Sequence, residues 1–322
     1  MKGLWLSVVF VAVPAVSLAQ VDVSLLPDIT IAAQSKAATW AAESPDGLFL
    51  ASCGEDGTVK VWKAEDWSLY KTISAPGTKK TADEFSPDME RFFETGSDGK
   101  VNVRKVGKSA GFGLEKTLPT GVGSVSALAI SSDGAVLAAA KDDIVKLWRL
   151  KDYYLKDLKE AAGQVRALAI SGDSRYLASA SDDETVYVYD LGTKKFLKSF
   201  KDEGYPCTAV ALSVDGAQIA YGGYSGTLRV RSVSSGAVLR TVPAHQKLMT
   251  SCAFSPDGKY LATSSIGGEI KIWRAGTFSL LKTLQGPGSG LLHLTFSYDS
   301  EDLIASGTDG TVEIWTMDRV LP

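Results

Sequence analysis

The chain repeats one pattern seven times, and no other feature restricts its fold as strongly. The first marker is the Asp of a turn that reads S-P-D-G in its first copy, and it returns at steps of 40 to 45 residues. An aromatic or arginine side chain follows each turn with the same period. The two markers occupy Asp46, Asp88, Asp133, Asp173, Asp215, Asp257 and Asp299, and Trp62, Arg104, Trp148, Tyr189, Arg231, Trp273 and Trp315. Two markers with one period indicate an array of similar units.

Each unit contains four short segments that favour β-strands. In the first unit, Phe49–Gly54 and Thr58–Trp62 are rich in β-branched and aromatic residues. A third segment, Ala37–Glu43, precedes them, and a fourth, Ser68–Ser74, follows. Outside the N-terminus the sequence shows no clear helical pattern. The unit is therefore predicted to be a four-stranded antiparallel sheet.

The turns of the first unit carry residues suited to tight chain reversal. Pro45 in the S-P-D-G stretch fits the second position of a type I turn. The pair Asp56-Gly57 fits a type I′ hairpin, in which both central residues have positive φ. Both faces of the predicted strands are apolar or small, as in Val125–Ile130. A single sheet cannot bury two faces, whereas a closed stack of such sheets can.

The units resemble WD40 repeats over roughly residues 29–316, most closely at Ser44–Trp62, Ser255–Trp273 and Leu303–Trp315. This resemblance implies an all-β fold, a seven-bladed β-propeller of four-stranded antiparallel blades. No Trp-Asp pair is present; the nearest match is Tyr189-Asp190. The Gly-His pair of the family is represented only by Ala244-His245.

The resemblance also implies a polar tetrad of His, Ser or Thr, Trp and Asp inside each blade. The first unit keeps Ser52, Asp56 and Trp62 but has Gln34 at the His position. The sixth keeps His245, Thr263 and Trp273 but has Gly267 at the Asp position, and the last keeps Ser306, Asp309 and Trp315 but has Pro287 at the His position. Since no set is complete, we expect packing rather than this network to hold the blades.

The repeat boundaries predict one domain over residues 20–322. The blades are expected near residues 37–73, 79–119, 123–158, 163–200, 205–242, 246–284 and 290–316. The seventh unit ends after its third strand, while Asp28–Ala33 is an unassigned strand before the first blade. We expect Asp28–Ala33 to complete the last blade and close the ring.

The first nineteen residues have the pattern of a secretory signal peptide. Lys2 precedes the apolar run Leu4–Val16, and small residues precede a cleavage site between Ala19 and Gln20. The run is too short for an ordinary membrane span. The expectation is a secreted or periplasmic protein with no membrane span after cleavage. The alternative is an uncleaved anchor with the propeller facing the cytoplasm.

Few residues favour chemistry. The two histidines, His245 and His293, are predicted to be packed, and their spacing fits no usual metal site, so no metal ion or cofactor is expected. The three cysteines, Cys53, Cys207 and Cys252, are predicted to be buried and free, with a Cys207–Cys252 bridge as the alternative. A formal charge of −3 and a pI near 5.6 argue against nucleic-acid binding.

A binding surface remains as the predicted site. The resemblance implies a protein or peptide partner on the narrow face of a monomeric, non-catalytic scaffold. By position, the contact residues are Tyr224, Ile266, Leu248, Leu292, Pro206, Lys141 and Arg166. Blades five to seven supply the apolar members, although some of these could instead pack into the central channel. The alternative function is a secreted propeller enzyme, a lyase or lactonase, with its site in that channel.

Overall fold

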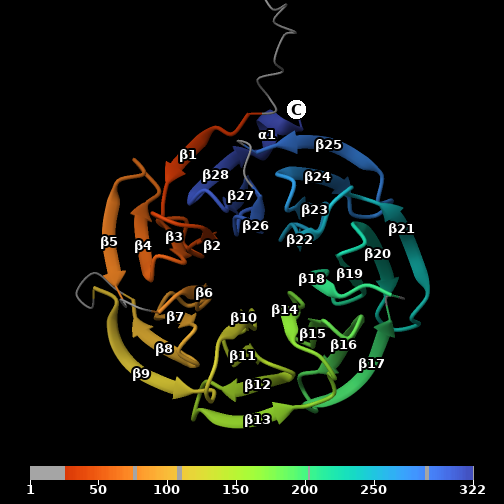
Figure 1. Ribbon diagram of the computed structural model, residues 1–322, viewed down its shortest axis with the longest axis horizontal. Coiled ribbons are helices and arrows are strands. Elements are labelled where there is room, and N and C mark those ends of the chain that lie inside the picture. Colours follow the sequence, from red (N-terminus) through yellow and green to blue (C-terminus); the bar gives the residue numbers. More distant parts are fainter. Residues whose placement is uncertain (1–25, 75–77, 107–110, 202–203, 287–289, 322) are drawn as a thin grey trace, which may run out of the picture.

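The structure, a computed structural model, describes residues 26–74, 78–106, 111–201, 204–286 and 290–321. Within these ranges, seven four-stranded sheets form a ring around a central channel (Figure 1). This arrangement confirms the predicted seven-bladed, all-β propeller. The predicted signal peptide, residues 1–19, lies outside the described residues.

The blades follow one another along the chain, and each begins with its innermost strand. Blade one contains β2 (Ala38–Glu43), β3 (Phe49–Gly54), β4 (Thr58–Lys63) and β5 (Leu69–Ser74). Blade two contains β6 (Lys80–Phe85), β7 (Arg91–Gly96), β8 (Lys100–Lys105) and β9 (Gly113–Pro119). Blade three contains β10 (Val125–Ile130), β11 (Val136–Lys141), β12 (Ile144–Arg149) and β13 (Tyr154–Leu158). Blade four contains β14 (Val165–Ile170), β15 (Tyr176–Ser181), β16 (Thr185–Asp190) and β17 (Lys195–Lys201). Blade five contains β18 (Cys207–Leu212), β19 (Gln218–Gly223), β20 (Thr227–Ser232) and β21 (Val238–Pro243). Blade six contains β22 (Met249–Phe254), β23 (Tyr260–Ser265), β24 (Glu269–Arg274) and β25 (Leu280–Gln285). Blade seven contains β26 (Leu291–Phe296), β27 (Asp302–Gly307), β28 (Thr311–Thr316) and β1 (Ile29–Ala32).

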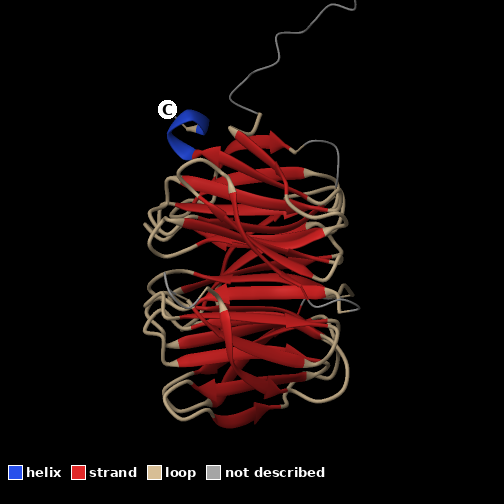
Figure 2. Ribbon diagram, turned by 90° about the vertical axis from the view of Figure 1, so that its left-hand side faces the viewer, coloured by secondary structure: helices blue, strands red, loops and turns tan. Residues whose placement is uncertain are grey.

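The antiparallel strands cross the thickness of the disc, so the loops gather on two opposite faces (Figure 2). The turns between first and second strands and between third and fourth strands lie on one face, which we call the turn face. The turns between second and third strands and the links between blades lie on the other, which we call the connection face. The positions that the resemblance assigns to partner binding belong to the connection face.

The recurring Asp of the sequence pattern holds the first turn of each blade. In blade one, Asp46 Oδ1 lies 2.6 Å from Ser44 Oγ and accepts a hydrogen bond from the Leu48 amide. The Gly47 amide donates to the Ser44 carbonyl, which closes the predicted four-residue turn. The same Ser–Asp pair recurs as Ser86–Asp88, Ser131–Asp133, Ser171–Asp173, Ser213–Asp215, Ser255–Asp257 and Ser297–Asp299. This marker therefore has a structural role in every blade.

The second turn of blade one differs from the type I′ hairpin predicted from Asp56-Gly57. Gly57 has φ +82°, but Asp56 is not among the residues with positive φ. The Gly57 amide donates to the Gly54 carbonyl across a three-residue loop, and Asp56 Oδ1 accepts from the Thr58 amide. The prediction is wrong because Asp56 uses its carboxylate to cap the turn instead of adopting a left-handed conformation.

Every boundary between neighbouring blades has its own apolar core. Each of the seven core clusters contains residues from two adjacent blades. Between blades seven and one, for example, Ile314 and Leu50 belong to one cluster, and between blades one and two, Val61 and Phe92 do. The blades thus bury both faces through their neighbours, as the sequence predicts.

Large aromatic residues occupy a strained position in several third-to-fourth-strand turns. Trp67, Phe112, Tyr153 and Phe278 have φ of 57°, 61°, 55° and 52°. This left-handed region is unfavourable for bulky side chains. Each ring packs against the core shared with the preceding blade; Phe112 joins the cluster of Val61, and Phe278 that of Val230. The backbone strain is offset by burial of the ring.

The ring closes by pairing the two ends of the described chain. β1 pairs antiparallel with β28, from Ile29 opposite Ile314 to Ala32 opposite Thr311. The predicted closing strand is therefore present. After β28 the chain forms a short helix, α1 (Met317–Val320), which the sequence analysis left unassigned. Met317 and Val320 are buried in the core between blades six and seven, where they fill the place of the turn aromatics.

Candidate functional site

The predicted contact positions of neighbouring loops meet on the connection face around the channel. In blade five the Tyr224 amide donates to the Pro206 carbonyl, and in blade six the Ile266 amide donates to the Leu248 carbonyl. Equivalent bonds join Glu55 to Ala37, Ser97 to Lys79, Asp182 to Gln164 and Thr308 to Gly290. In these six blades the bond joins the residue just after the second strand to the residue just before the innermost strand, and so places both in one rim around the channel.

The rim over blades one to four is polar, and several of its charged side chains pair with one another. Arg166 Nε lies 2.9 and 3.0 Å from the two carboxylate oxygens of Asp182. Lys79 Nζ lies 3.0 Å from Glu55 Oε1 and so links blade two to blade one. These pairs reduce the unbalanced charge on this half of the rim.

Lys141 is buried, contrary to its predicted role as a contact residue. Its side chain was predicted to contact a partner, but the residue is only 5% exposed. The ammonium pairs with Asp142, and the side chain lies against Gly123. Asp142 has φ 53° in a two-residue loop, and this tighter hairpin turns Lys141 inward. Lys141 is thus a packed residue and not a surface contact.

The rim over blades five to seven is apolar and partly open to solvent. Tyr224 is 55% exposed, and Leu248, Ile266 and Pro206 are half-buried. Ile266 reaches the next blade, because a Cβ on Gly290 would lie 2.8 Å from Ile266 Cδ1. Leu292 is also half-buried but lines the channel. These side chains are neither fully in the core nor fully in solvent.

The innermost strands of the seven blades surround the centre of the ring (Figure 1). Below the rim, side chains from all seven line a channel of about 400 Å³. A ring of side chains at the second position of each inner strand surrounds its mouth. Thr39 Oγ1 donates to the Lys80 carbonyl at 3.0 Å, Ser126 Oγ to the Val165 carbonyl at 2.6 Å and Thr208 Oγ1 to the Met249 carbonyl at 2.7 Å. Each bond joins one blade to the next. Arg166 and Leu292, two of the predicted contact residues, stand at the same position in β14 and β26, but the bonds from one blade to the next were not predicted.

Titratable groups gather at the turn-face end of the channel. Burial, followed by the charge of Asp83, raises the pKa of Glu84 to about 8. Burial lowers the pKa of His293 to about 4, so its imidazole is neutral near pH 7. His293 lies against Trp40 with ring centroids 5.9 Å apart. Glu84 and His293 line the same cavity with Tyr298.

The predicted polar tetrads are bridged by replacement residues. In blade one, Gln34 Nε2 donates to Ser52 Oγ at 3.1 Å, and Trp62 Nε1 donates to the same oxygen at 3.2 Å. Gln34 Oε1 lies 2.7 Å from the Thr58 hydroxyl, which in turn lies 2.7 Å from Asp56. Gln34 thus bridges the incomplete tetrad of the first blade, because a side-chain amide carries both a donor and an acceptor.

Blade six replaces a different member of the tetrad. His245 Nε2 lies 2.9 Å from Thr263 Oγ1, and Trp273 Nε1 donates to that oxygen at 3.1 Å. Glu269 Oε2 lies 2.8 Å from His245 Nδ1 and supplies the carboxylate that Gly267 cannot. In blade seven, Asp309 Oδ1 accepts hydrogen bonds from the amide and the hydroxyl of Thr311, and Trp315 is fully buried.

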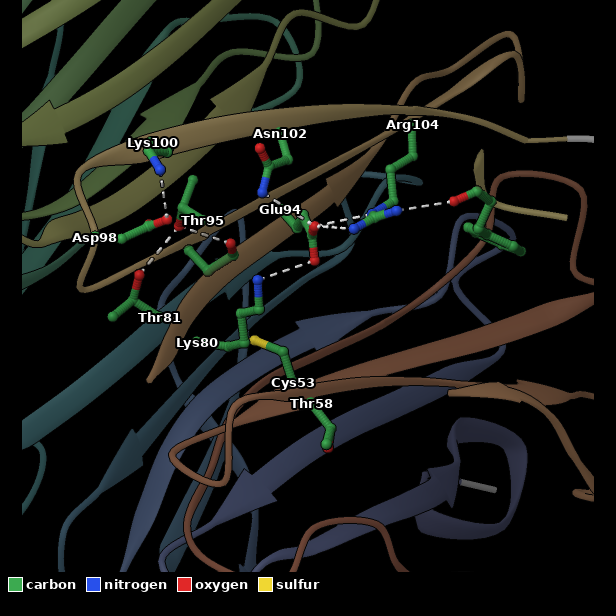
Figure 3. A network of polar contacts seen from close by, with 12 residues as sticks. Cys53, Thr58, Lys80, Thr81, Glu94, Thr95, Asp98, Lys100, Asn102 and Arg104 are labelled. Carbon is green, nitrogen blue, oxygen red and sulfur yellow. Dashed lines mark hydrogen bonds and ion pairs between the residues drawn. The ribbon is translucent and has the colours of Figure 1, made fainter. Parts of the chain in front are cut away.

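Blade two contains a buried ionic network instead of a tetrad (Figure 3). Glu94, which has no exposed area, lies 2.6 Å from the Arg104 guanidinium and 3.1 Å from Lys80 Nζ. Asn102 donates to the same carboxylate, and Arg104 also donates to the Phe112 carbonyl. Arg104 thus occupies the Trp position and anchors the strained turn of its blade. Blade five uses Arg231 similarly, with Tyr221 as partner.

All three cysteines, Cys53, Cys207 and Cys252, are buried thiols that form no disulfide, so the alternative Cys207–Cys252 bridge is wrong. Across the described ranges, no group of three or more His, Cys, Asp or Glu side chains is placed to hold a metal ion. No helix in the described residues is long and apolar enough to cross a membrane.

The family model of the WD domain, G-beta repeat (WD40), matches residues 30–63, 114–149, 154–190, 236–274 and 278–316, more than half of the chain. The chain belongs to the WD40 repeat family. The two long stretches between these matches contain most of blades two and five. Those are the blades in which Arg104 and Arg231 replace the aromatic marker. Both are four-stranded sheets like the other blades of the WD40 propeller, although the family model does not match most of their residues.

Among known proteins, the chain is similar to the periodic tryptophan protein 2 homolog of Dictyostelium discoideum. The two are 28% identical over 121 residues, which are 36% of this chain and 13% of that protein. The chain thus matches only a small part of this relative's length. WD40 propellers generally bind protein partners.

Proposed function

We propose that this WD40 propeller is a non-catalytic, protein-binding scaffold whose partner contacts the connection face over blades five to seven. The observation that carries the proposal is the half-exposed apolar rim of Tyr224, Ile266, Leu248 and Pro206. Apolar side chains gathered at a solvent-facing rim favour association with another protein. Tyr224 supplies a large, amphipathic anchor of the kind that dominates such interfaces.

The internal ion pairs over blades one to four support the same orientation. Because Arg166–Asp182 and Lys79–Glu55 already satisfy one another, a partner gains little by contacting them. The apolar half gains free energy when water is removed from it. We therefore place the centre of the interface over blades five to seven, with the charged half at its edge.

A double substitution tests the surface. Tyr224→Asp with Ile266→Asp should abolish capture of the partner from the native exported fraction, while the melting temperature stays near that of the parent chain. Tyr154→Asp with Leu280→Asp is the matched control, since both residues are exposed on outer strands. Undiminished capture by the double variant would overturn the proposal. If that variant unfolds, Tyr224→Asp alone replaces it, because Tyr224 is the more exposed residue.

We also propose that the protein acts outside the cytoplasm, as a secreted or periplasmic scaffold. The proposal rests on the signal pattern of residues 1–19, with cleavage between Ala19 and Gln20. Sequencing the N-terminus of the mature protein tests it. A chain that begins at Gln20 supports export, whereas a chain that retains the apolar run supports a membrane anchor.

A further inference from the structure

A second surface lies on the turn face, opposite the rim, at the boundary between blades one and two. It is a groove of about 800 Å³. Its walls come from the first turn of blade one with the end of β2, from the third-to-fourth-strand turn of that blade, from Met89, Val106 and Phe112 of blade two, and from Asp302 at the start of β27 in blade seven. The groove belongs to loops that the partner-binding rim does not use.

Apolar and aromatic side chains form the floor and sides of this groove. Leu48 is 58% exposed and Tyr70 40% exposed, and the Phe49 and Tyr70 rings lie with centroids 5.3 Å apart. Trp67 and Phe112, the aromatics of the two strained turns, also line it. Because Leu48 and Tyr70 remain open to solvent, the groove suits an extended ligand better than an enclosed small molecule.

One end of the groove is acidic. Glu43, Asp46 and Asp302 line it, and Asp299 and Glu301 lie close enough to act on Glu43. Burial, followed by the charges of Asp299 and Asp302, raises the pKa of Glu43 to about 7. Among the described residues no hydrogen bond or ion pair to the Glu43 carboxylate is present, and the nearby Lys63 lies 3.8 Å from Glu65. Lys63 also lines the groove but pairs with Glu65, and the carboxylates at the acidic end repel one another.

We propose that this groove binds a segment of a partner protein that carries apolar side chains followed by an arginine or lysine. The apolar side chains cover Leu48, Phe49 and Tyr70, and the cation lies among Glu43, Asp46 and Asp302. Charge complementarity selects this occupant, because a basic side chain removes the repulsion at the acidic end. An arginine can at the same time stack on the neighbouring aromatic rings.

The proposed segment binds independently of the rim partner. The groove and the rim lie on opposite faces of the disc, joined only through the strands that cross it (Figure 2). A scaffold with two such faces can hold two proteins at once. Binding in the groove is therefore expected even if the rim binds no partner, and it can be measured on a protein whose rim carries Tyr224→Asp.

The test uses the mature chain with Tyr224→Asp, so that the rim does not select peptides. Random short peptides displayed on phage are selected on this protein, and the affinity of the enriched peptides is measured by fluorescence anisotropy. We expect peptides with apolar residues next to arginine or lysine. Replacing that basic residue by glutamate should weaken binding by about tenfold or more.

Reciprocal changes in the protein locate the site. Glu43→Lys should weaken the basic peptide by about tenfold and restore binding of its glutamate version, and Leu48→Asp should abolish both. Asp143→Lys, on the exposed connection-face loop of blade three, is the matched control and should change nothing. Leu48 is exposed enough for its variant to fold, which a thermal melt verifies. Enriched peptides that bind the Leu48→Asp variant as well as the parent, or selection without basic residues, would overturn the proposal.

Discussion

At the scale of single residues, Gln34 and His245 show how one polar bridge is built from different side chains. In blade one the Gln34 amide links Ser52 to Thr58 and thereby to Asp56. In blade six the His245 ring links Thr263 to Glu269. Each side chain ends in two hydrogen-bonding atoms, Nε2 and Oε1 in Gln34 and Nδ1 and Nε2 in His245. The bridge survives because its geometry, and not the residue type, satisfies the buried hydroxyl.

Gln34→Ala should lower the free energy of unfolding by about 1 to 2 kcal/mol, because it removes the three side-chain hydrogen bonds of Gln34 and leaves the Thr58 and Ser52 oxygens less satisfied. Gln34→His should retain most of the stability by reproducing the blade-six arrangement. Urea denaturation measures both, with the exposed Gln246→Ala as control. Equal stability of Gln34→Ala and the parent chain would show that the network contributes nothing.

Glu313 in β28 is a buried acid without a partner. It is 1% exposed, and neither carboxylate oxygen has a hydrogen bond within the described residues. Burial, followed by the charge of Asp309, raises its pKa from the ordinary 4.5 to about 8. A carboxylic acid with a raised folded-state pKa stabilises the fold only while it stays protonated.

Stability linked to Glu313 is complete below about pH 4.5 and is lost as the pH rises through about 8. Glu313→Gln should match the parent near pH 5 and exceed it by about 2 to 4 kcal/mol near pH 9. Urea denaturation at the two pH values checks this, with the exposed Glu301→Gln as control. A gain of equal size at both pH values would contradict the titration.

At the scale of elements, the aromatic turns of blades one, two, three and six pack each of these blades against the one before it. Phe278 is 3% exposed, packs in the core between blades five and six and has φ 52°. Burial of such a ring contributes more than the backbone strain costs. In blade seven, which has no such turn, α1 fills the equivalent space with Met317 and Val320. The same part of the core between two blades is thus filled by a turn aromatic in blade six and by a helix in blade seven.

Phe278→Ala should lower the free energy of unfolding by about 3 to 5 kcal/mol. Phe278→Gly should be less harmful than Phe278→Ala by about 1 kcal/mol, because glycine adopts a left-handed conformation without strain. This order is the reverse of the usual one for strands and helices. Chemical denaturation of the two variants measures it. Greater stability of the alanine variant would show that the turn relaxes to negative φ.

The sequence predicted the strands and the ring because Ser44, Asp46 and their copies recur with a fixed period. It could not predict that Gln34 bridges the tetrad. Only the structure shows that the Gln34 amide contacts Ser52 as the His245 ring contacts Thr263. Trp67 and Phe278 escaped notice because nothing in a local pattern favours an aromatic at positive φ. The inward turn of Lys141 depends on a shorter hairpin that other blades do not share. The repeat period can be recognised in the sequence, whereas the replacement of one residue's contacts by those of a distant residue cannot.

At the scale of the whole molecule, closure depends on residues at opposite ends of the described chain. Besides the β1–β28 ladder, Asp28 Oδ2 accepts a hydrogen bond from the Thr316 amide at 2.7 Å, and its other oxygen lies 2.9 Å from Arg319 Nε. Because the first strand pairs with the last, the ring can close only when the entire repeat array is present. Blade seven otherwise presents an open strand edge.

A chain that begins at Lys36 should therefore lose closure. We expect the melting temperature to fall by at least about 5 °C, together with concentration-dependent association through the free edge of β28. A chain that begins at Leu26 keeps β1 and serves as the control. Thermal melts and size-exclusion chromatography measure both effects. Adding a peptide with the sequence of residues 26–35 should restore part of the lost stability, since the missing strand can pair from outside. A shortened chain that stays monomeric with an unchanged melting temperature would show that the seven blades hold their ring without the N-terminal strand.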